Sequence, residues 1–334
     1  MKYIFLLGTI GGGIILFLGG LSRGAETLPS KDFSTRTEFS VEETSKTTGV
    51  FVGDIMPGRY VETLSERFGY DYLLASTTEI FSEADFVFGN LEGPVPLFHE
   101  KTPVYGYGFS FPFSSLTALK KVGISVASLG NNHAFDQGKV GYSETVLSLQ
   151  KSGISGIPYN GAIVGEWGKE EIRFVALNDT FSPVTESEIN RLIPDDEIFT
   201  VVSVHWGLEY EPLSAERQKK LGRAFIDAGA DLVIGTHPHV VQEIEVYKGK
   251  PIFYSLGNFL FDQYFSEETE EGLAVKMTID GKNVSYGLMP VDLRKSHPQK
   301  MKGVDAEKFL KDLSLRVDAT LSSDIRKGFI ILSR

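Results

Sequence analysis

Residues 235–239 of the chain read Gly235-Thr236-His237-Pro238-His239 and follow an apolar run at residues 231–234. A short apolar run of this kind predicts a buried strand, so the two histidines stand where that strand ends. Side chains alternate along extended backbone, and Pro238 biases the residue before it towards an extended conformation, so both imidazoles can point the same way. Neutral imidazole is a common ligand of zinc, iron and manganese. The stretch therefore predicts a metal site, with a turn that carries two surface histidines as the alternative.

The composition of the 334-residue chain is that of an ordinary globular protein, with 42% hydrophobic and 23% charged residues. Its formal net charge of -11 argues against a nucleic-acid-binding surface, so no nucleic-acid partner is expected. The chain has no cysteine, which excludes disulfides, thiolate zinc sites and cysteine nucleophiles. A metal site here must therefore use imidazole, carboxylate or amide ligands.

The N-terminal part of the sequence predicts attachment to a membrane. Residues 3–21 carry no charge and are rich in Ile, Leu, Phe and Gly. A helix of that length spans roughly 28 Å, close to the hydrocarbon thickness of a bilayer. We predict that residues 1–21 are an uncleaved signal anchor, so that the protein crosses the cell membrane once and its C-terminal domain is extracellular. A cleaved signal peptide, which would give a secreted protein, is the alternative.

Residues 22–48 are rich in Ser, Thr, Glu and Lys and predict a flexible linker. From residue 49, strands alternate with helices and a strand-rich end follows, which predicts an α/β or α+β fold with two packed sheets. Predicted strands lie at residues 50–52, 86–88, 124–129, 172–177 and 199–204, and predicted helices at 61–68, 114–122, 140–152 and 215–228. Two antiparallel pairs, 243–247 with 252–254 and 273–279 with 284–288, complete a domain that ends at residue 293. Residues 294–334 are a C-terminal extension packed on that domain, with a helix near residues 305–315.

Residues 98–113 are rich in aromatic side chains that alternate at period two. This alternation is typical of a strand edge or a binding loop. We expect the aromatic side chains to be used mainly for core packing of one face.

Side chains of the types that bind metals follow the strand ends in five separate segments. They are Asp54; Asn90 and Glu92; Asn132 and His133; His205; and His237 and His239. Each segment alone has an ordinary alternative, such as a helix N-cap for the Asp, a plain turn for the Asn-x-Glu stretch, or a structural role for a lone His. Because five segments repeat the pattern, we expect their side chains to converge at one rim and hold a divalent metal.

The order of these motifs resembles that of the calcineurin-like metallophosphoesterases, and more closely their CapA (PgsA) branch, the poly-γ-glutamate capsule biosynthesis proteins. The resemblance covers about residues 49–293. It rests on Gly53-Asp54-Ile55-Met56-Pro57-Gly58-Arg59, Asn90-Leu91-Glu92-Gly93-Pro94, Asn131-Asn132-His133, Val204-His205-Trp206-Gly207, Gly235-Thr236-His237-Pro238-His239 and Tyr254-Ser255-Leu256-Gly257-Asn258-Phe259. It implies a four-layer α/β/β/α sandwich with the site at the strand ends.

The resemblance also implies roles for single residues. One or two divalent ions, Mn, Zn or Fe, would be held by Asp54, Asn90, Glu92, Asn132, His205, His237 and His239. His133 would act on the leaving group, with Asp136 orienting it and Arg59 holding an anionic substrate group. Met56 stands where the superfamily has a histidine ligand, and a thioether is a poor ligand for hard divalent ions. This departure leaves a single ion, or a different pair, as the expectation.

Two functions follow from the resemblance. The first is a membrane-anchored extracellular protein of capsule or poly-γ-glutamate biosynthesis or export. Such a protein would work beside membrane-bound polymer synthetase subunits and take an anionic polymer or a phosphorylated substrate. The second is a metal-dependent hydrolase of phosphoester or γ-glutamyl bonds that is not tied to capsule synthesis.

Overall fold

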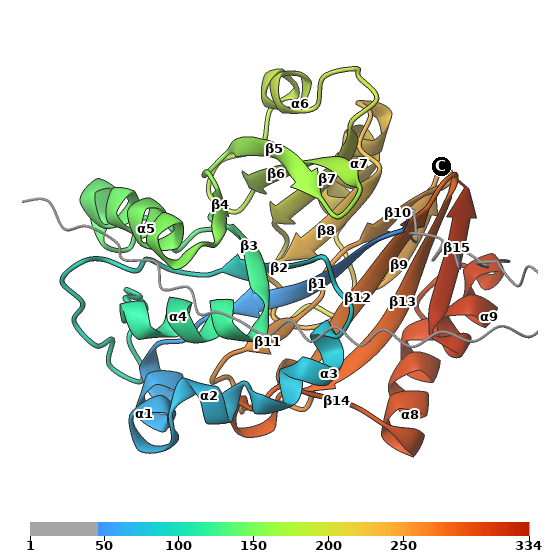
Figure 1. Cartoon of the computed structure of the whole chain (residues 1–334). Coiled ribbons are helices and arrows are strands. Elements are labelled where there is room, and N and C mark those ends of the chain that lie inside the picture. The colour runs from blue at the N-terminus through green and yellow to red at the C-terminus, as the bar shows by residue number, and fades with distance from the viewer. Residues whose placement is uncertain (1–45, 334) are drawn as a thin grey trace, which may run out of the picture. The chain divides into compact units, whose positions relative to one another are not determined.

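Two β-sheets form the centre of the fold in the computed structural model, which describes residues 46–333 (Figure 1). The predicted signal anchor and residues 22–45 of the predicted linker lie outside the described residues. Strand β1 begins at Thr47, so the predicted boundary at residue 49 is two residues too late. Among the residues that the structure describes, no helix combines the length and apolar character needed to cross a membrane.

The larger sheet has nine strands and the smaller sheet has six. The nine-stranded sheet contains β1 (Thr47–Ile55), β2 (Phe86–Leu91), β3 (Ile124–Ser128), β4 (Ser155–Ile157), β11 (Asn258–Leu260), β12 (Glu271–Asp280), β13 (Asn283–Asp292), β14 (Gln299–Lys300) and β15 (Phe329–Ser333). The six-stranded sheet runs in the order β5 (Gly161–Trp167), β6 (Glu170–Asn178), β7 (Phe199–His205), β8 (Leu232–Thr236), β10 (Lys250–Phe253) and β9 (Ile244–Tyr247). The two antiparallel pairs predicted from the sequence, β9 with β10 and β12 with β13, are confirmed.

The two sheets pack face to face, because alternate side chains of each strand enter a shared core. Phe51 of β1 faces this core, while its neighbours Val50 and Val52 face the opposite side of the sheet. Phe88 of β2 stacks on Phe174 of β6 with ring centroids 6.1 Å apart, which joins the sheets directly. Burial of each such side chain contributes about 1.5–3 kcal/mol.

Helices cover the outer face of each sheet (Figure 1). Against the nine-stranded sheet lie α1 (Arg59–Phe68), α2 (Tyr70–Leu73), α3 (Thr78–Phe81), α4 (Phe113–Val122) and α5 (Gly138–Ser152). Against the six-stranded sheet lie α6 (Glu186–Leu192) and α7 (Glu216–Asp227). The described residues thus form an α/β sandwich in which helices flank two central sheets.

The C-terminal segment is integrated into this sandwich. Its helices α8 (Gly303–Ser314) and α9 (Ala319–Lys327) place Phe309, Leu313 and Ile325 in the same core as the inner faces of the sheets. Strand β15 pairs with β13, beside which it is drawn in Figure 1. Residues 294–333 therefore extend the large sheet and cover part of its inner face.

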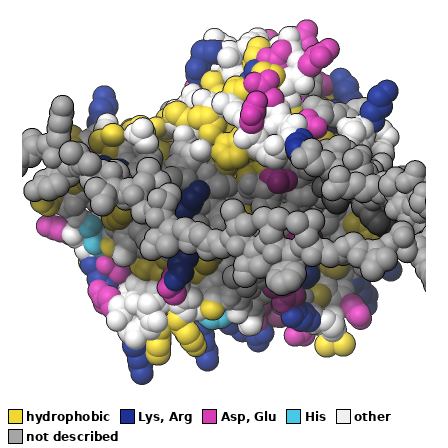
Figure 2. Space-filling model, in the orientation of Figure 1, with side chains coloured by type: hydrophobic (Ala, Val, Ile, Leu, Met, Phe, Trp, Pro, Cys, Tyr) yellow, Lys and Arg dark blue, Asp and Glu magenta, His cyan; other side chains and the backbone are white. Residues whose placement is uncertain are grey.

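The aromatic-rich segment is a loop rather than a strand edge. Phe109 and Phe111 are buried, whereas Tyr105 and Tyr107 are exposed. The expected core packing is therefore confirmed for Phe109 and Phe111 only. Elsewhere on the face drawn in Figure 2, positive and negative side chains of the described residues lie close together rather than in separate fields.

Candidate metal centre

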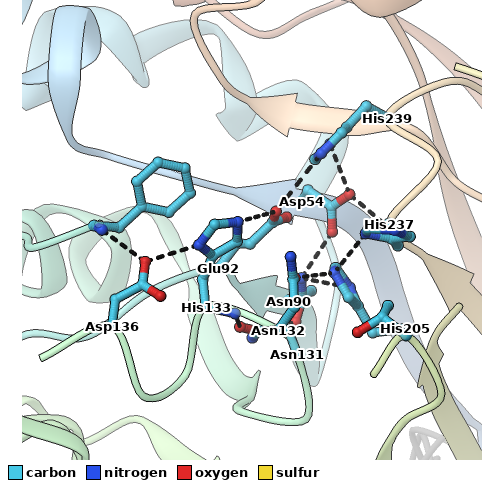
Figure 3. Close-up of polar contacts among 12 residues, drawn as sticks. Asp54, Asn90, Glu92, Asn131, Asn132, His133, Asp136, His205, His237 and His239 are labelled. Carbon is cyan, nitrogen blue, oxygen red and sulfur yellow. Dashed lines mark hydrogen bonds and ion pairs between the residues drawn. The ribbon is translucent and has the colours of Figure 1, made fainter. Parts of the chain in front are cut away.

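The candidate residues lie together where parallel strands of both sheets end. In the large sheet, the pairing of β1 with β2 sets Asp54 beside Asn90. In the small sheet, the pairing of β7 with β8 sets His205 beside Thr236, directly before His237. The carboxyl ends of these strands meet at one rim, which brings the five sequence segments to a common point (Figure 3). Asp54, Glu92, His205 and His239 are all at most 3% exposed.

The His-Pro-His stretch adopts a different backbone from the one we expected. His237 and His239 have φ angles of 95° and 60°, so neither is extended, and β8 ends before both of them. Such left-handed conformations cost about 1–3 kcal/mol each for residues other than glycine. The turn is held because the His237 backbone N–H donates to Asp54 Oδ2 at 3.2 Å. Both rings reach the site through this turn rather than through strand alternation.

Gly235 and Gly53 allow the close approach on which this rim depends. A side chain at Gly235 would collide with the carbonyl group of Tyr254, and one at Gly53 with the carbonyl group of Gly257. The strand-end backbones therefore approach each other too closely for any residue with a Cβ atom. Glycine at position 235 therefore makes room for a neighbouring strand end.

Asp54 is held from two sides and does not cap a helix. The N-cap residue of α1 is Gly58, while Asp54 Oδ1 accepts a hydrogen bond of 2.7 Å from Asn90 Nδ2. The Asn90 oxygen in turn accepts from Asn131 Nδ2 at 3.0 Å. Asn90 therefore presents its nitrogen to the site and orients Asp54, which differs from the ligand role expected for it. The sequence motif that contains Asn131 does not predict this role for it.

Glu92 is the least satisfied group of the site. Both of its carboxylate oxygens are buried without a hydrogen-bond partner among the described residues. His239 Nε2 lies 3.7 Å and His133 Nε2 lies 4.0 Å from Glu92 Oε1. Burial, and after it the neighbouring Asp54, raises the pKa of Glu92 well above its ordinary value. A cation placed among these groups would favour the ionised carboxylate.

His239 has a defined tautomer. Its Nδ1 lies 3.0 Å from Asn258 Oδ1 and 3.3 Å from Asp54 Oδ2, so this nitrogen is bracketed by two acceptors and carries the proton. The Asn258 amide is fixed because its nitrogen donates to Gln263 Oε1 and to the Thr269 carbonyl, both at 3.0 Å. The Nε2 lone pair of His239 is therefore left to face Glu92. Nothing in the sequence assigned Asn258 this part.

His205 and His237 lie in contact, with His237 Nδ1 3.1 Å from His205 Nε2. Asn132 Oδ1 is 2.8 Å from the same His205 nitrogen. Burial, followed by His237, lowers the pKa of His205 well below its ordinary value, and burial, followed by His239, lowers the pKa of His237 to about 4. Both rings are therefore neutral at pH 7 and can offer lone pairs to a metal.

The structure groups the potential ligand atoms into two sets. Asp54, Glu92 and His205 form one, and Glu209, His237 and His239 form the other; within each set the atoms lie within 4.8 Å of one another. Glu209 was not predicted, because an exposed carboxylate in a loop has no pattern that marks it. Met56 is fully buried in the core between the large sheet and its helices, so it offers no ligand here.

His133 and Asp136 are adjacent, as Figure 3 shows. His133 Nδ1 lies 2.7 Å from Asp136 Oδ2, which also accepts from the Phe109 backbone N–H at 2.7 Å. The Phe109 ring stacks on the imidazole with centroids 4.1 Å apart. The acceptor at Nδ1 and the stacked ring together aim His133 Nε2 towards Glu92.

Arg59 is already paired. Its Nη2 donates to Asp262 Oδ1, and its guanidinium lies 5.2 Å and 5.4 Å from the ring centroids of Phe109 and Phe261. The expected contact of Arg59 with an anionic substrate group stays a prediction, and in this structure one of its Nη groups is used by Asp262. The sequence could not associate two residues that lie 203 positions apart.

The fold and the site define an α/β sandwich protein with a cluster of metal-type ligands at the strand ends. The family model for "Bacterial capsule synthesis protein PGA_cap" matches residues 48–178 and 170–263, and the chain belongs to that family. This confirms the family that the motifs predicted.

Two relatives match most of the chain. The capsule biosynthesis protein CapA of Bacillus anthracis is 30% identical over 287 residues, which is 77% of this chain and 70% of that protein. The PGA biosynthesis protein CapA of Bacillus subtilis (strain 168) is 33% identical over 282 residues, 75% of this chain and 73% of that protein. Among solved structures, TT1561 of Thermus thermophilus covers 77% of this chain and 99% of its own, with 10% identity and a TM-score of 0.43. A structural similarity this distant gives no information about the site.

Proposed function

We propose that the protein is an accessory protein in the synthesis or export of an anionic capsule polymer, of which poly-γ-glutamate is the first candidate. The observation that carries this proposal is the match to two proteins named for capsule and PGA biosynthesis over about three quarters of the chain. Residues 1–21 would anchor the protein in the cell membrane, with the sandwich outside, since residues 3–21 are uncharged and apolar. Its partners would be membrane-bound polymer synthetase subunits and the polymer itself.

We further propose that the rim binds a divalent cation. The observation that carries this part is Glu92, whose two buried oxygens lack a hydrogen-bond partner among the described residues while the imidazoles of His239 and His133 lie near it. Asp54, Glu92, Asn132, His205, His237 and His239 would hold the ion, a mixed oxygen and nitrogen set that suits Mn, Zn or Fe. A bound cation would supply Lewis-acid polarisation of a phosphoryl or acyl oxygen.

The capsule role is tested in a strain whose own copy of the gene is deleted. The double variant His205→Ala with His237→Ala should lose polymer output, because it removes two neutral donors from the rim. His297→Ala is the matched control, since this partly buried histidine pairs with Ser76 Oγ and is not among the rim residues. Unchanged polymer output from a double variant that is still present and folded would contradict a role for the rim in capsule synthesis.

A second candidate function, hydrolysis of a phosphoester or a γ-glutamyl amide, is favoured by the pair of His133 and Asp136. With its Nδ1 held by the carboxylate, His133 can carry a proton at Nε2 and deliver it to a leaving group at the rim. The full-length chain purified in detergent should then turn over an aryl phosphodiester or a γ-glutamyl anilide with Mn²⁺ or Zn²⁺. His133→Asn should reduce kcat about 10²–10⁴-fold. Failure of the unmodified chain to turn over either substrate would leave only the accessory role.

A further inference from the structure

The loop that follows β7 is fastened to the His-Pro-His turn. The Tyr210 backbone N–H donates to the Pro238 carbonyl at 2.8 Å, which ties the loop to the residue between the two histidines. The Tyr210 ring lies 6.1 Å from the His239 ring and 5.0 Å from the Phe265 ring. The loop also bends through two left-handed residues, Gly207 with φ 83° and Tyr210 with φ 66°. Its position over the rim is therefore set by specific contacts.

Glu209 occupies the centre of this fastened loop. One of its carboxylate oxygens and one nitrogen from each of His237 and His239 lie within 4.8 Å of one another. Unlike the other carboxylates of the rim, Glu209 is exposed. The group around it shares no residue with the group of Asp54, Glu92 and His205.

We propose that Glu209 is a metal ligand, which closes an outer donor set with His237 and His239 beside the inner, buried set. The inference rests on the proposed metal site and adds to it a residue and a second position. Two imidazoles and one carboxylate are a donor set that binds Zn²⁺, Mn²⁺ or Fe²⁺, and the exposed side of Glu209 leaves coordination positions open to a ligand from solvent. The backbones of both histidines are fixed in left-handed conformations, and the His239 ring lies 6.1 Å from the Tyr210 ring of the loop. An outer ion would therefore meet donors that are already oriented.

The carboxylate of Glu209 contributes negative charge to the outer donor set. Within the outer set the imidazole rings of the two histidines carry no negative charge, so without Glu209 no negative charge would come from the set itself. Glu209 supplies that charge from the solvent side, where its own desolvation costs little. The inner set differs, because its two carboxylates, Asp54 and Glu92, are buried.

The test is metal binding by the full-length chain purified in detergent, with Mn²⁺ and Zn²⁺ as separate probes. Isothermal titration and elemental analysis would be run on the unmodified chain, on Glu209→Gln, and on Glu211→Gln. Glu211 is the matched control because it is an exposed glutamate of the same loop outside the donor set. We expect Glu209→Gln to lose one bound ion or to weaken binding at least tenfold, while Glu211→Gln stays within twofold of the unmodified chain.

Three other outcomes would count against the inference in distinguishable ways. Equal binding by all three proteins would overturn the role of Glu209 and leave the proposed metal site standing. Equal weakening by both variants would show a general effect of loop charge, which also overturns the ligand role. Absence of bound metal in the unmodified chain, with either probe, would overturn the metal site itself and the inference with it.

Discussion

Replacing Glu92 with Gln should stabilise the metal-free protein and destabilise the metal-loaded one. Glu92 is 1% exposed, and neither of its oxygens has a hydrogen-bond partner among the described residues. An unsatisfied buried polar group costs about 1–3 kcal/mol, and a charged one costs more. Glu92→Gln removes the charge, so we expect a gain of about 1–3 kcal/mol in chelator. For a protein of this size, that gain raises Tm by about 2–5 °C.

Bound metal should make the unmodified chain more stable than Glu92→Gln. A ligand that binds only the folded state at a hundred times its Kd adds about 2.7 kcal/mol of stability. The unmodified chain should gain this amount with Mn²⁺ or Zn²⁺, whereas Glu92→Gln lacks an anionic donor and should gain much less. Thermal unfolding followed by circular dichroism, in EDTA and in excess metal, measures both differences. A Glu92→Gln protein that is less stable than the unmodified chain in EDTA would refute the reasoning.

The same variant has a predicted pH dependence. Because burial and Asp54 raise the pKa of Glu92 in the folded state, its carboxyl contributes stability that is present below the unfolded-state pKa of about 4.3. That contribution is lost as pH rises through the higher folded-state pKa. The advantage of Glu92→Gln in EDTA should therefore grow from pH 4 to pH 8. Glu62→Gln is the control, since Glu62 also has a buried unpartnered oxygen but pairs with His99, outside the rim.

Three further predictions concern residues to which the sequence assigned no role. Asn258→Ala removes the acceptor of His239 Nδ1, and it should weaken Mn²⁺ or Zn²⁺ binding by about 10–100-fold in isothermal titration; unchanged affinity of the folded variant would contradict the tautomer assigned here. Glu271, whose pKa burial and then Glu267 raise to about 6, contributes stability below about pH 4 that is lost as pH rises through 6. Glu271→Gln should therefore gain about 1 kcal/mol on the unmodified chain between pH 4 and pH 7 in urea unfolding, a value reduced for solvent screening at this half-buried site. Glu268→Gln should show the opposite trend, because a backbone amide and Ser266 lower the pKa of Glu268.

The sequence predicted the parts of the fold that depend on local pattern. Apolar runs located strands such as β7 and β8, and helical patterns located helices such as α4 and α5. The same apolar runs located the candidate ligands, because a polar side chain that directly follows a buried strand lies at the rim where the strands end. The short helices α2 and α3 were not predicted, since four residues carry too little periodicity to be recognised.

The parts that sequence could not predict depend on contacts between distant residues. The pairing of Arg59 with Asp262 and the bond from His239 to Asn258 join segments whose separation no local pattern encodes. Asn90 presents its side-chain nitrogen rather than its oxygen to the site, because the oxygen accepts a hydrogen bond from Asn131. Residue type therefore identified the region of the site, while the partners of each polar atom decided which residues are donors and which hold those donors in place.

The site combines several features that cost stability when no cation is bound. His237 and His239 hold left-handed backbone conformations, Glu92 is buried without a partner among the described residues, and two neutral imidazoles lie in contact. Each would be disfavoured in a region that served only to pack the sheets, and simple substitutions would relieve each. A cation offsets several of them at once, because it partners the orphan carboxylate and uses the lone pairs of the imidazoles. The concentration of these costs at one rim, rather than throughout the sandwich, is thus the physical reason to place the binding site there.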